Sequence, residues 1–429
     1  MPFAVMLAAS LASQAPQHVR VGSWNLEFFG NRRNEPRSDA DIAEVGHYIG
    51  ELGVDVLAVQ EVGTPQALQK LVGSLGPRWQ FVLGSTGMWR DGSGGQRLGF
   101  LWNDARVELL QAEELLDLPR EAEDPQTGRL PIFHRVPLCA AFRARNGGLD
   151  FRAVTVHLKA DNRSDLDKHQ RDEMSTRKRA AEMRALGRAL TAMLAKPGED
   201  QDLVLLGDFN HVFARERSSE TPDETKVRYD LRVSLLSDLP GFVRLPPATP
   251  RPTIRYFPES IDHVVVSAGL REEALPATVA VHGPFETSRQ PTEAELDAWQ
   301  KAYSDHFPLT LDLDAAEDRD PDATFAAVDR GHELRPGGYA AAAAPVRPAT
   351  PALESPAPTA QARTIAARSD RGPAGLLGPG RRVELRMIAG GAFVGTLLER
   401  PQGEWVHLQL DNGAAVAVPT RNVAAVVEK

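Results

Sequence analysis

A short apolar run that ends in polar residues is the feature of this sequence that most constrains its fold. Residues 203–206 (Leu-Val-Leu-Leu) are followed by Gly207, Asp208, Phe209 and Asn210. The run is too short for a helix and is bounded by glycine, so it predicts a strand covered on both faces. Asp208 and Asn210 lie two residues apart, which points both side chains the same way on an extended backbone. Their oxygens suit a hard divalent cation or a phosphate, although Asp and Asn are also common turn residues.

Five other apolar runs end in polar residues or lead into a polar loop. These motifs are Trp24-Asn25, Gln60-Glu61, His157-Leu158-Lys159, Ile261-Asp262-His263 and Ser304-Asp305-His306. Each motif alone has a structural interpretation, because polar residues at strand ends also cap strands and form turns. Together they supply amide and carboxylate oxygens without a thiolate, which is the ligand set that Mg²⁺ or Mn²⁺ prefers. Two histidines add groups that titrate near neutral pH.

Phosphodiester hydrolysis requires both kinds of group. The attacking water must lose a proton, and the charge that develops on the phosphate must be neutralised. Asp305 lies next to His306 in the sequence, which suggests that this carboxylate orients the ring. Adjacent side chains on an extended strand diverge, however, so Asp305 could instead serve a metal while another carboxylate holds His306. The sequence leaves this choice open.

Read in order, the motifs resemble those of the endonuclease/exonuclease/phosphatase superfamily, in particular its pancreatic-type deoxyribonuclease branch. The resemblance covers residues 19–313 and rests on six motifs: Ser-Trp-Asn-Leu, Gln-Glu-Val, Val-His-Leu-Lys, Gly-Asp-Phe-Asn, Ile-Asp-His-Val and Ser-Asp-His-Phe-Pro-Leu. It implies an α/β fold, a four-layered sandwich in which two packed mixed β-sheets are flanked by helices. All six motifs would lie along one edge of the paired sheets.

The resemblance also implies metal ligands and a proton acceptor. Asn25 and Glu61 resemble the metal-binding pair, with Glu61 the principal ligand of Mg²⁺ or Mn²⁺. His306 resembles the general base, and Asp305 beside it contributes to the metal or to the pair. Asp262 resembles the carboxylate that orients one of the histidines.

The remaining motif residues resemble groups that contact the substrate. Asp208 and Asn210 resemble the residues that position the nucleophilic water and the phosphate. His157 resembles a phosphate-binding histidine, which some members use as an acid, and Arg135 a phosphate-contacting arginine of the deoxyribonuclease branch. His263 alternates away from Asp262 along its strand, so we expect a structural role for it.

Two departures from the deoxyribonuclease branch bear on the substrate. Leu98 stands where that branch has a tyrosine that packs into the minor groove. The secreted mammalian enzymes of that branch have two disulfides, whereas the single Cys139 of this chain excludes an intrachain disulfide. The apolar surroundings of Cys139 predict a small core residue. Both departures weaken a specific prediction of duplex DNA cleavage and leave the hydrolytic chemistry unaffected. The loops of residues 159–162 and 211–229 are expected to set substrate choice.

Composition divides the chain into four segments. Residues 1–17 resemble a secretory signal without its positive charge, or a disordered N-terminus, so export is weighed slightly above a cytoplasmic location. Residues 18–314 alternate strand-like and helix-like patterns and form the predicted catalytic domain. Residues 315–379 are rich in Ala and Pro and are predicted to be a disordered linker. Residues 380–429 recover strand character. No apolar run of about 18 residues or more is present, so no transmembrane segment is expected.

Strands outnumber helices in the predicted catalytic domain and often follow one another, which favours two packed sheets. Helices are expected at residues 39–52, 65–75, 166–194 and 292–302. Strands are expected at residues 19–26, 54–62, 79–83, 98–102, 107–110, 136–142, 149–158, 203–206, 261–267 and 307–313.

The last 50 residues read as five short strands with tight turns. Asp411-Asn412-Gly413 is a strong hairpin signal between two of them. The pattern resembles a small SH3-like or Sm-like β-barrel, which would mediate oligomerisation or bind RNA or peptide. A structural or oligomerising role is favoured over RNA binding.

Two classes of function remain. The first is a Mg²⁺- or Mn²⁺-dependent phosphoesterase, with a nucleic-acid phosphodiester as the favoured substrate and a phospholipid or sugar phosphate as the alternative. The second is a scaffold that binds phosphates without hydrolysis. The net charge of −9 argues against a protein that holds nucleic acid mainly by bulk attraction, but not against a nuclease with a local basic groove. Because every motif residue is present, the enzyme is favoured.

Overall fold

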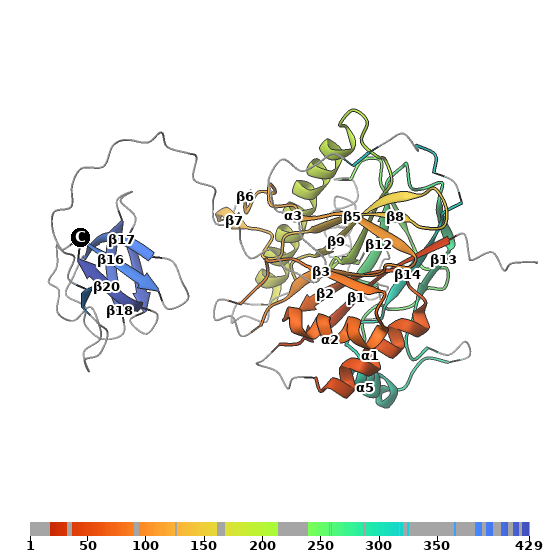
Figure 1. Ribbon diagram of the computed structural model, residues 1–429, viewed down its shortest axis with the longest axis horizontal. Helices are drawn as coiled ribbons and strands as arrows, with labels where there is room; N and C mark the ends of the chain where they lie inside the picture. The colour runs from red at the N-terminus through yellow and green to blue at the C-terminus, as the bar shows by residue number, and fades with distance from the viewer. Residues whose placement is uncertain are drawn as a thin grey trace, which may run out of the picture. The chain divides into compact units, whose positions relative to one another are not determined.

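Figure 1 shows the computed structural model of the chain. It describes residues 18–31, 37–89, 94–124, 127–160, 168–212, 239–256, 258, 260–285, 289–316, 318–320 and 324–325, together with the strands of the C-terminal segment. The side chains of residues 168–173 and of the C-terminal strands are not described. The signal-like segment of residues 1–17, most of the predicted linker and most of the 211–229 loop lie outside the described residues.

The first of two large sheets has six strands in the order β13-β14-β1-β2-β4-β3. Its strands are β1 (His18–Phe29), β2 (Val56–Val62), β3 (Trp79–Leu83), β4 (Arg97–Asn103), β13 (Ala274–Val281) and β14 (Leu309–Asp314). β1 and β2 run parallel, whereas β14 is antiparallel to β1. The sheet is therefore mixed, as predicted.

The second sheet also has six strands, in the order β11-β12-β10-β9-β8-β5. Its strands are β5 (Val107–Glu114), β8 (Leu138–Ala144), β9 (Asp150–His157), β10 (Leu203–Asp208), β11 (Val243–Leu245) and β12 (Asp262–Val266). β9 and β10 are parallel, and β12 pairs antiparallel with β10. Every residue of β10 is buried, which confirms the strand predicted from the apolar run.

Helices cover the outer faces of the two sheets (Figure 1). α1 (Asp39–Leu52), α2 (Pro65–Leu75) and α5 (Glu293–Ala302) lie on one side, and α3 (Lys168–Leu194) lies on the other. The buried stripe of α3, which includes Met183 and Leu186, packs in one cluster with Val154 and Leu205 of the second sheet. The result is the predicted four-layered α/β sandwich. None of the described helices is long and apolar enough to cross a membrane.

The core between the two sheets is aromatic and contains one buried polar link. Phe142 packs against Phe100 and Trp102 of the facing sheet, with ring centroids 5.9 and 6.0 Å apart. Gln60 is fully buried, and its amide nitrogen donates to Ser23 Oγ at 3.1 Å and to Thr155 Oγ1 at 2.9 Å. Because Thr155 belongs to the second sheet, these bonds connect the sheets next to the end of β2. The amide nitrogen of Gln60 keeps both bonds only in this alignment of the sheets, which they therefore favour, whereas its Oε1 has no hydrogen-bond partner among the described residues.

Several strands were not predicted. β6 (Glu121–Asp124) and β7 (Gly128–Pro131) form a separate two-stranded hairpin, and β11 and β13 are edge strands of the two sheets. β13 contains Pro276, and its pairing with β14 shifts register between Leu275 and Ala280. Proline has no backbone N–H to donate to a neighbouring strand and occurs in sheets mainly at edges and bulges. A strand that contains it is therefore hard to predict from sequence.

The contacts within the chain form two units, Met1–Val346 and Arg347–Lys429. In the second unit, six strands pair in the order β15-β20-β16-β17-β18-β19. They are β15 (Thr364–Ile365), β16 (Arg382–Met387), β17 (Ala392–Leu397), β18 (Trp405–Leu410), β19 (Ala415–Pro419) and β20 (Val423–Glu428). β18 and β19 pair antiparallel, as the Asp-Asn-Gly signal between them predicts. Closure of this sheet into a barrel remains a prediction, as do the proposed segment boundaries.

Substitution of Gly73 by alanine is expected to stabilise the protein by about 0.5–1 kcal/mol, because glycine in a helix has excess unfolded-state freedom. Gly73 lies on the exposed face of α2, and a Cβ placed there meets no atom within 4 Å. Urea unfolding followed by circular dichroism measures the change. A destabilised variant would contradict the open environment of this position.

Candidate active site

The six predicted motifs meet at one edge of the paired sheets. His157 and Asp208 end the parallel strands β9 and β10 and are register partners. Asp262 begins β12 and faces Asp208 across the antiparallel pair. Asn25 and Glu61 lie toward the ends of β1 and β2 in the other sheet, and His306 lies just before β14. The carboxyl ends of parallel strands share one edge, which explains why motifs so distant in sequence converge.

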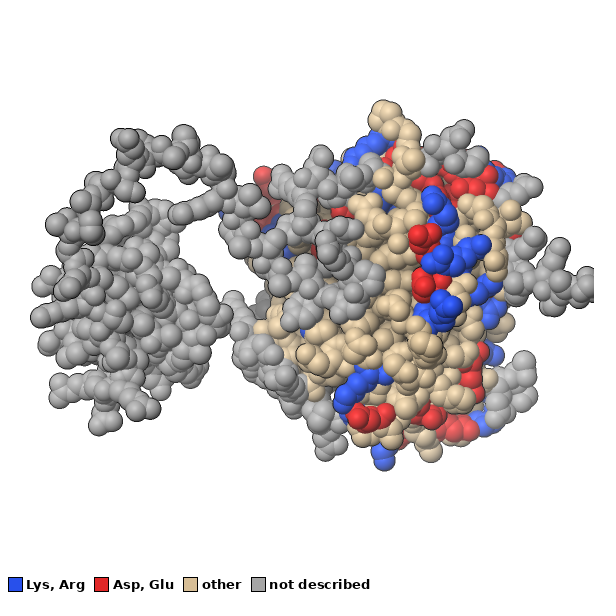
Figure 2. All heavy atoms as spheres, in the orientation of Figure 1, with Lys and Arg blue, Asp and Glu red and all other residues tan. Residues whose placement is uncertain are grey.

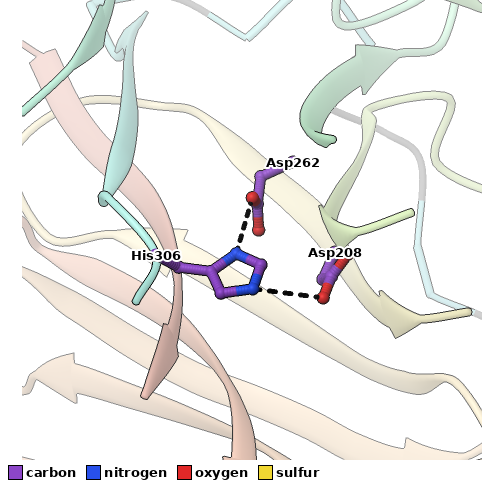
Figure 3. A group of neighbouring side chains, drawn as sticks. All are labelled: Asp208, Asp262 and His306. Carbon is purple, nitrogen blue, oxygen red and sulfur yellow. Dashed lines mark hydrogen bonds and ion pairs between the residues drawn. The ribbon is translucent and has the colours of Figure 1, made fainter. Parts of the chain in front are cut away.

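His306 and Asp262 form a buried ion pair at the centre of this edge (Figure 3). His306 Nδ1 lies 2.9 Å from Asp262 Oδ2, and both residues are less than 5% exposed. The other ring nitrogen, Nε2, faces Asp208 Oδ2 at 3.8 Å. Burial alone would lower the pKa of His306, but Asp262, Asp208 and Asp305 outweigh it and raise the pKa well above its ordinary value. The ring is therefore a strong proton acceptor held in one orientation.

The structure answers the question that the sequence left open about Asp305. Asp262, not Asp305, holds the His306 ring by its Nδ1 atom. The nearest approach of Asp305 is 4.0 Å, from its Oδ1 to His306 Nε2. The Asp305 backbone N–H donates to Glu27 Oε2 at 3.1 Å. The two adjacent side chains thus have different neighbours, and the Asp305 carboxylate stays available to a cation.

Asn25 joins the carboxylates of the two sheets. Its Nδ2 donates to Asp208 Oδ2 at 3.1 Å and to Glu61 Oε1 at 3.3 Å, and it lies 3.4 Å from His306 Nε2. Its Oδ1 accepts the Glu27 N–H at 3.1 Å. Asn25 therefore bridges Glu61 and Asp208 through its amide nitrogen. An oxygen contact from Asn25 to a cation in this position would require the amide group to flip.

Asp208 is buried among other charged groups. Burial and the nearby Asp262 raise its pKa to about 7, even though its Oδ1 accepts the Asn210 N–H at 2.8 Å. A buried carboxylate beside further carboxylates is stabilised by a cation, which removes the repulsion. The oxygen donors of Glu61, Asp208 and Asp305 match the chemistry of a hard divalent ion. Asp208, Asp262 and His306 present ligand atoms within 4.8 Å of one another, so this edge offers a candidate cation site, while the predicted ligand set of Asn25, Glu61 and Asp305 remains a prediction.

His157 faces the same carboxylates from the second sheet. Its Nε2 lies 3.4 Å from Asp208 Oδ2 and 3.8 Å from Glu61 Oε1. Burial, with Arg135 and His306 nearby, holds its pKa well below the ordinary value. His157 is therefore neutral at neutral pH. Its buried Nδ1 has no hydrogen-bond partner among the described residues.

Arg135 and Asn210 bond to the backbone that follows His157. Arg135 Nε donates to the carbonyl of His157 at 3.0 Å, and its Nη2 to that of Leu158 at 3.0 Å. Its Nη1 donates to Gln96 Oε1 at 2.6 Å. Asn210 Nδ2 donates to the same Leu158 carbonyl at 3.1 Å, and Asn210 adopts a φ of 49°. Both side chains fix the turn that carries His157, and this support was not predicted for either of them.

His263 has the structural role predicted for it. Its Nε2 lies 2.7 Å from the His211 carbonyl, and its Nδ1 accepts from Arg244 Nε at 3.1 Å. Two supports of the site were not predicted. Ser304 Oγ donates to the Asn25 carbonyl and accepts the His306 N–H, and Thr253 Oγ1 accepts the Asp262 N–H. Ser304 stands inside a predicted motif, whereas nothing local marks Thr253.

Leu98 and Cys139 are both core residues. Leu98 is 2% exposed, and Cys139 is a buried free thiol. Leu98 therefore presents no side chain to a substrate. Residues 161–162 and most of the 211–229 loop, which are expected to set substrate choice, lie outside the described residues.

Comparison with known proteins identifies the family. A sequence model of the endonuclease/exonuclease/phosphatase family matches residues 22–306, well over half of the 429-residue chain. The chain belongs to this family. Members of the endonuclease/exonuclease/phosphatase family are phosphoester hydrolases that depend on divalent metals. The matched range begins just before the Ser-Trp-Asn-Leu motif and ends at His306.

Individual members of the family share limited sequence identity with the chain. A deoxyribonuclease of Thioalkalivibrio sp. (strain K90mix) is 30% identical over 160 residues, which are 36% of this chain and 39% of that protein. The chain thus spans about two fifths of the length of this curated relative. A family protein from Bacteroides vulgatus has 18% identity and a TM-score of 0.44, covering 70% of this chain and 99% of that one. The catalytic domain of human nocturnin has 16% identity and a TM-score of 0.43, covering 70% and 95%.

Proposed function

We propose that this protein is a Mg²⁺- or Mn²⁺-dependent phosphodiesterase that hydrolyses nucleic acid. One observation carries the proposal. A buried histidine, held by Asp262, directs its other ring nitrogen at Asp208, which Asn25 links to Glu61. A proton acceptor and a cation site side by side are the two requirements for attack of water on a phosphodiester.

In this proposal His306 is the general base. Asp262 keeps the Nδ1 proton of the ring in place. A bound cation would offset the carboxylates that raise the pKa of the ring, so that Nε2 could take the proton of the attacking water. Ser304 Oγ accepts the His306 backbone N–H at 3.0 Å, and Trp24 Nε1 donates to the His306 carbonyl at 3.1 Å. The ring is thus fixed at its backbone as well as at its side chain. Such positioning saves the entropy of aligning the base with the water.

The other residues hold the phosphate and the cation. Glu61, with Asp305 and Asn25, would bind the ion, which supplies charge neutralisation at the phosphate when bound. Asp208 and Asn210 orient the water and the phosphate. His157, neutral and facing Asp208, is placed to donate a hydrogen bond to a phosphate oxygen. The Arg135 side chain donates to the backbone carbonyls of His157 and Leu158 and so fixes this turn, and its positive charge would lie near the phosphate.

One observation supports a nucleic-acid substrate, and a second bears on how the protein would hold it. The chain is 30% identical to a curated deoxyribonuclease over 160 residues. On the face seen in Figure 2, the described basic and acidic side chains lie next to one another in a band and do not gather into a broad patch of one sign. Local contacts to the phosphates at the site, and not bulk attraction, would then hold the nucleic acid.

Hydrolysis is expected to stop on removal of divalent metal and to return on addition of Mg²⁺ or Mn²⁺. The assay is a panel of single-stranded DNA, duplex DNA, RNA, sphingomyelin, phosphoinositides and bis(p-nitrophenyl) phosphate, each with Mg²⁺, with Mn²⁺ or with EDTA. We expect cleavage of at least one nucleic acid and of the small diester. Cleavage of a lipid or sugar phosphate alone would replace the proposed substrate class. Activity that persists in EDTA would contradict the metal dependence.

A further inference from the structure

A second group of carboxylates lies at the opposite edge of the second sheet from the active site. Asp150 is the first residue of β9, and Asp200 and Asp202 immediately precede β10. Asp318 and Asp320 follow β14 and fall in the segment predicted as a linker. The catalytic residues lie at the other ends of β9 and β10, so the two groups are about 20 Å apart at the usual rise of a strand.

The carboxylates of this second group are close enough to share one ion. Asp150, Asp200 and Asp318 present oxygens within 4.8 Å of one another, and so do Asp200, Asp202 and Asp320. Two oxygens on opposite sides of a Ca²⁺ ion are separated by about 4.8 Å, twice the usual Ca–O distance of about 2.4 Å. Asp200 belongs to both trios and lies at the centre of the group.

The buried members of the group lack the hydrogen bonds that buried oxygens normally make. Asp200 is 0% and Asp202 is 2% exposed, and the Oδ2 atom of each has no hydrogen-bond partner among the described residues. Backbone bonds nevertheless fix the cluster. The Asp202 N–H donates to Asp200 Oδ1 at 2.8 Å, and the Gln201 N–H donates to Asp320 Oδ2 at 3.0 Å. Unpartnered oxygens on fixed carboxylates point to a missing positive ligand.

Protein cations leave most of this charge uncompensated. Arg143 pairs with Asp150 at 2.7 Å, and Arg319 pairs with Glu272 and Glu273, not with the cluster. No other basic side chain among the described residues forms an ion pair with the five aspartates. Burial and neighbouring acids raise the pKa of Asp200 to about 9 and that of Asp202 to about 8. Carboxyls in this state bind either protons or a cation.

We propose that Asp150, Asp200, Asp202, Asp318 and Asp320 form a Ca²⁺ site that is separate from the catalytic centre and fastens the segment after β14 to the sheet. An all-carboxylate cage favours Ca²⁺, which takes six to eight oxygens in flexible geometry. Mg²⁺ demands a tight octahedron and keeps several waters.

The surrounding backbone shows what the ion would hold in place. The Thr324 N–H donates to the Gly198 carbonyl at 2.9 Å, and the Asp200 N–H donates to the Thr324 carbonyl at 3.2 Å. The Phe325 ring packs on the Arg152 guanidinium at 4.8 Å. The chain after β14 therefore returns to the start of β10, and the aspartates cross-link the two. A bound Ca²⁺ ion would hold the segment after β14 against the start of β10 despite the mutual repulsion of the aspartates.

The test is a thermal unfolding titration of the full-length protein with Ca²⁺, with Mg²⁺ held in excess to saturate the catalytic centre. The Tm of the wild type is expected to rise by about 5 °C when Ca²⁺ exceeds its Kd a hundredfold. Asp320→Asn, at the half-buried rim of the cluster, is expected to lose this rise. It should also have a higher Tm than the wild type in EGTA, because it removes an unbalanced charge. Calcium binding measured by calorimetry should fall in parallel.

Two control variants separate this site from others. Asp314→Asn makes the same change at the exposed last residue of β14, where asparagine can still accept the Ala316 N–H. Glu61→Gln disables the catalytic cation site. Both are expected to keep the full calcium response. A wild type without a calcium response, or an Asp320→Asn variant that keeps it, would overturn the proposal. A response lost in Glu61→Gln would assign the calcium to the catalytic centre and would overturn it equally.

Discussion

Replacement of His306 by alanine is expected to lower kcat/KM for phosphodiester hydrolysis by about 10²–10⁴-fold, the usual contribution of a positioned general base. The ring nitrogen of His306 has no substitute. His157 Nε2 also faces Asp208 Oδ2, at 3.4 Å, but its pKa is depressed and its Nδ1 has no hydrogen-bond partner among the described residues to orient the ring. Glu61→Ala is expected to cause a comparable loss through the cation. Both variants are assayed on bis(p-nitrophenyl) phosphate with Mg²⁺ or Mn²⁺.

Two further variants make this prediction specific. His282→Gln replaces a half-buried histidine whose Nε2 lies 2.8 Å from Thr310 Oγ1, away from the site, and should keep wild-type activity. Asp262→Asn should lose activity nearly as completely as His306→Ala, and the double variant should be no worse than either single one, because the pair acts as a unit. Metal-dependent turnover retained in both His306→Ala and Glu61→Ala would refute the mechanism.

Gly207→Ala is expected to destabilise the protein by about 3–5 kcal/mol, the sum of backbone strain and overpacking. Gly207 adopts a φ of 141°, and a Cβ on it would lie 2.1 Å from the Val156 carbonyl oxygen of β9. Relief of this clash moves β9 away from β10, and these two strands carry His157 and Asp208. The free energy of unfolding is measured by urea titration, and the activity at a temperature where the variant is folded.

Gly73→Ala adds the same atom with the opposite expected sign and is the matched control for Gly207→Ala. The contrast tests whether close contact of β9 and β10, and not loss of glycine as such, sets the cost. A Gly207→Ala variant as stable as the wild type would mean that the two strands have room to separate.

The parts of the site that follow from the sequence are those that local pattern encodes. An apolar run marks a buried strand, and a polar pair after it marks the strand end, so the convergence of Glu61, His157 and Asp208 at one edge was predictable. α1, α2 and β3 have the bounds that their spacing predicts. The family resemblance then supplied a role for each motif residue.

The other features of the site depend on tertiary contacts that no local sequence pattern specifies. Asp262, which holds His306, is 44 residues away in the chain and belongs to the other sheet. Glu61 and Asn210 adopt positive φ angles of 60° and 49°. Asparagine tolerates this backbone, but a glutamate gives no sign of it in the sequence. The phosphate contact of Arg135 stays a prediction, whereas the hydrogen bonds from three of its donors to protein acceptors could not be predicted from sequence.

Each large sheet contributes half of the proposed catalytic residues. Asn25, Glu61 and His306 come from the first sheet and its adjoining loop, and His157, Asp208 and Asp262 come from the second. Neither half contains both the base and the carboxylate that holds it. A chain emerging from the ribosome therefore carries no working site until residue 306 has been made and its strand has docked beside β1. We therefore expect the proposed hydrolytic activity to appear only when the domain is complete.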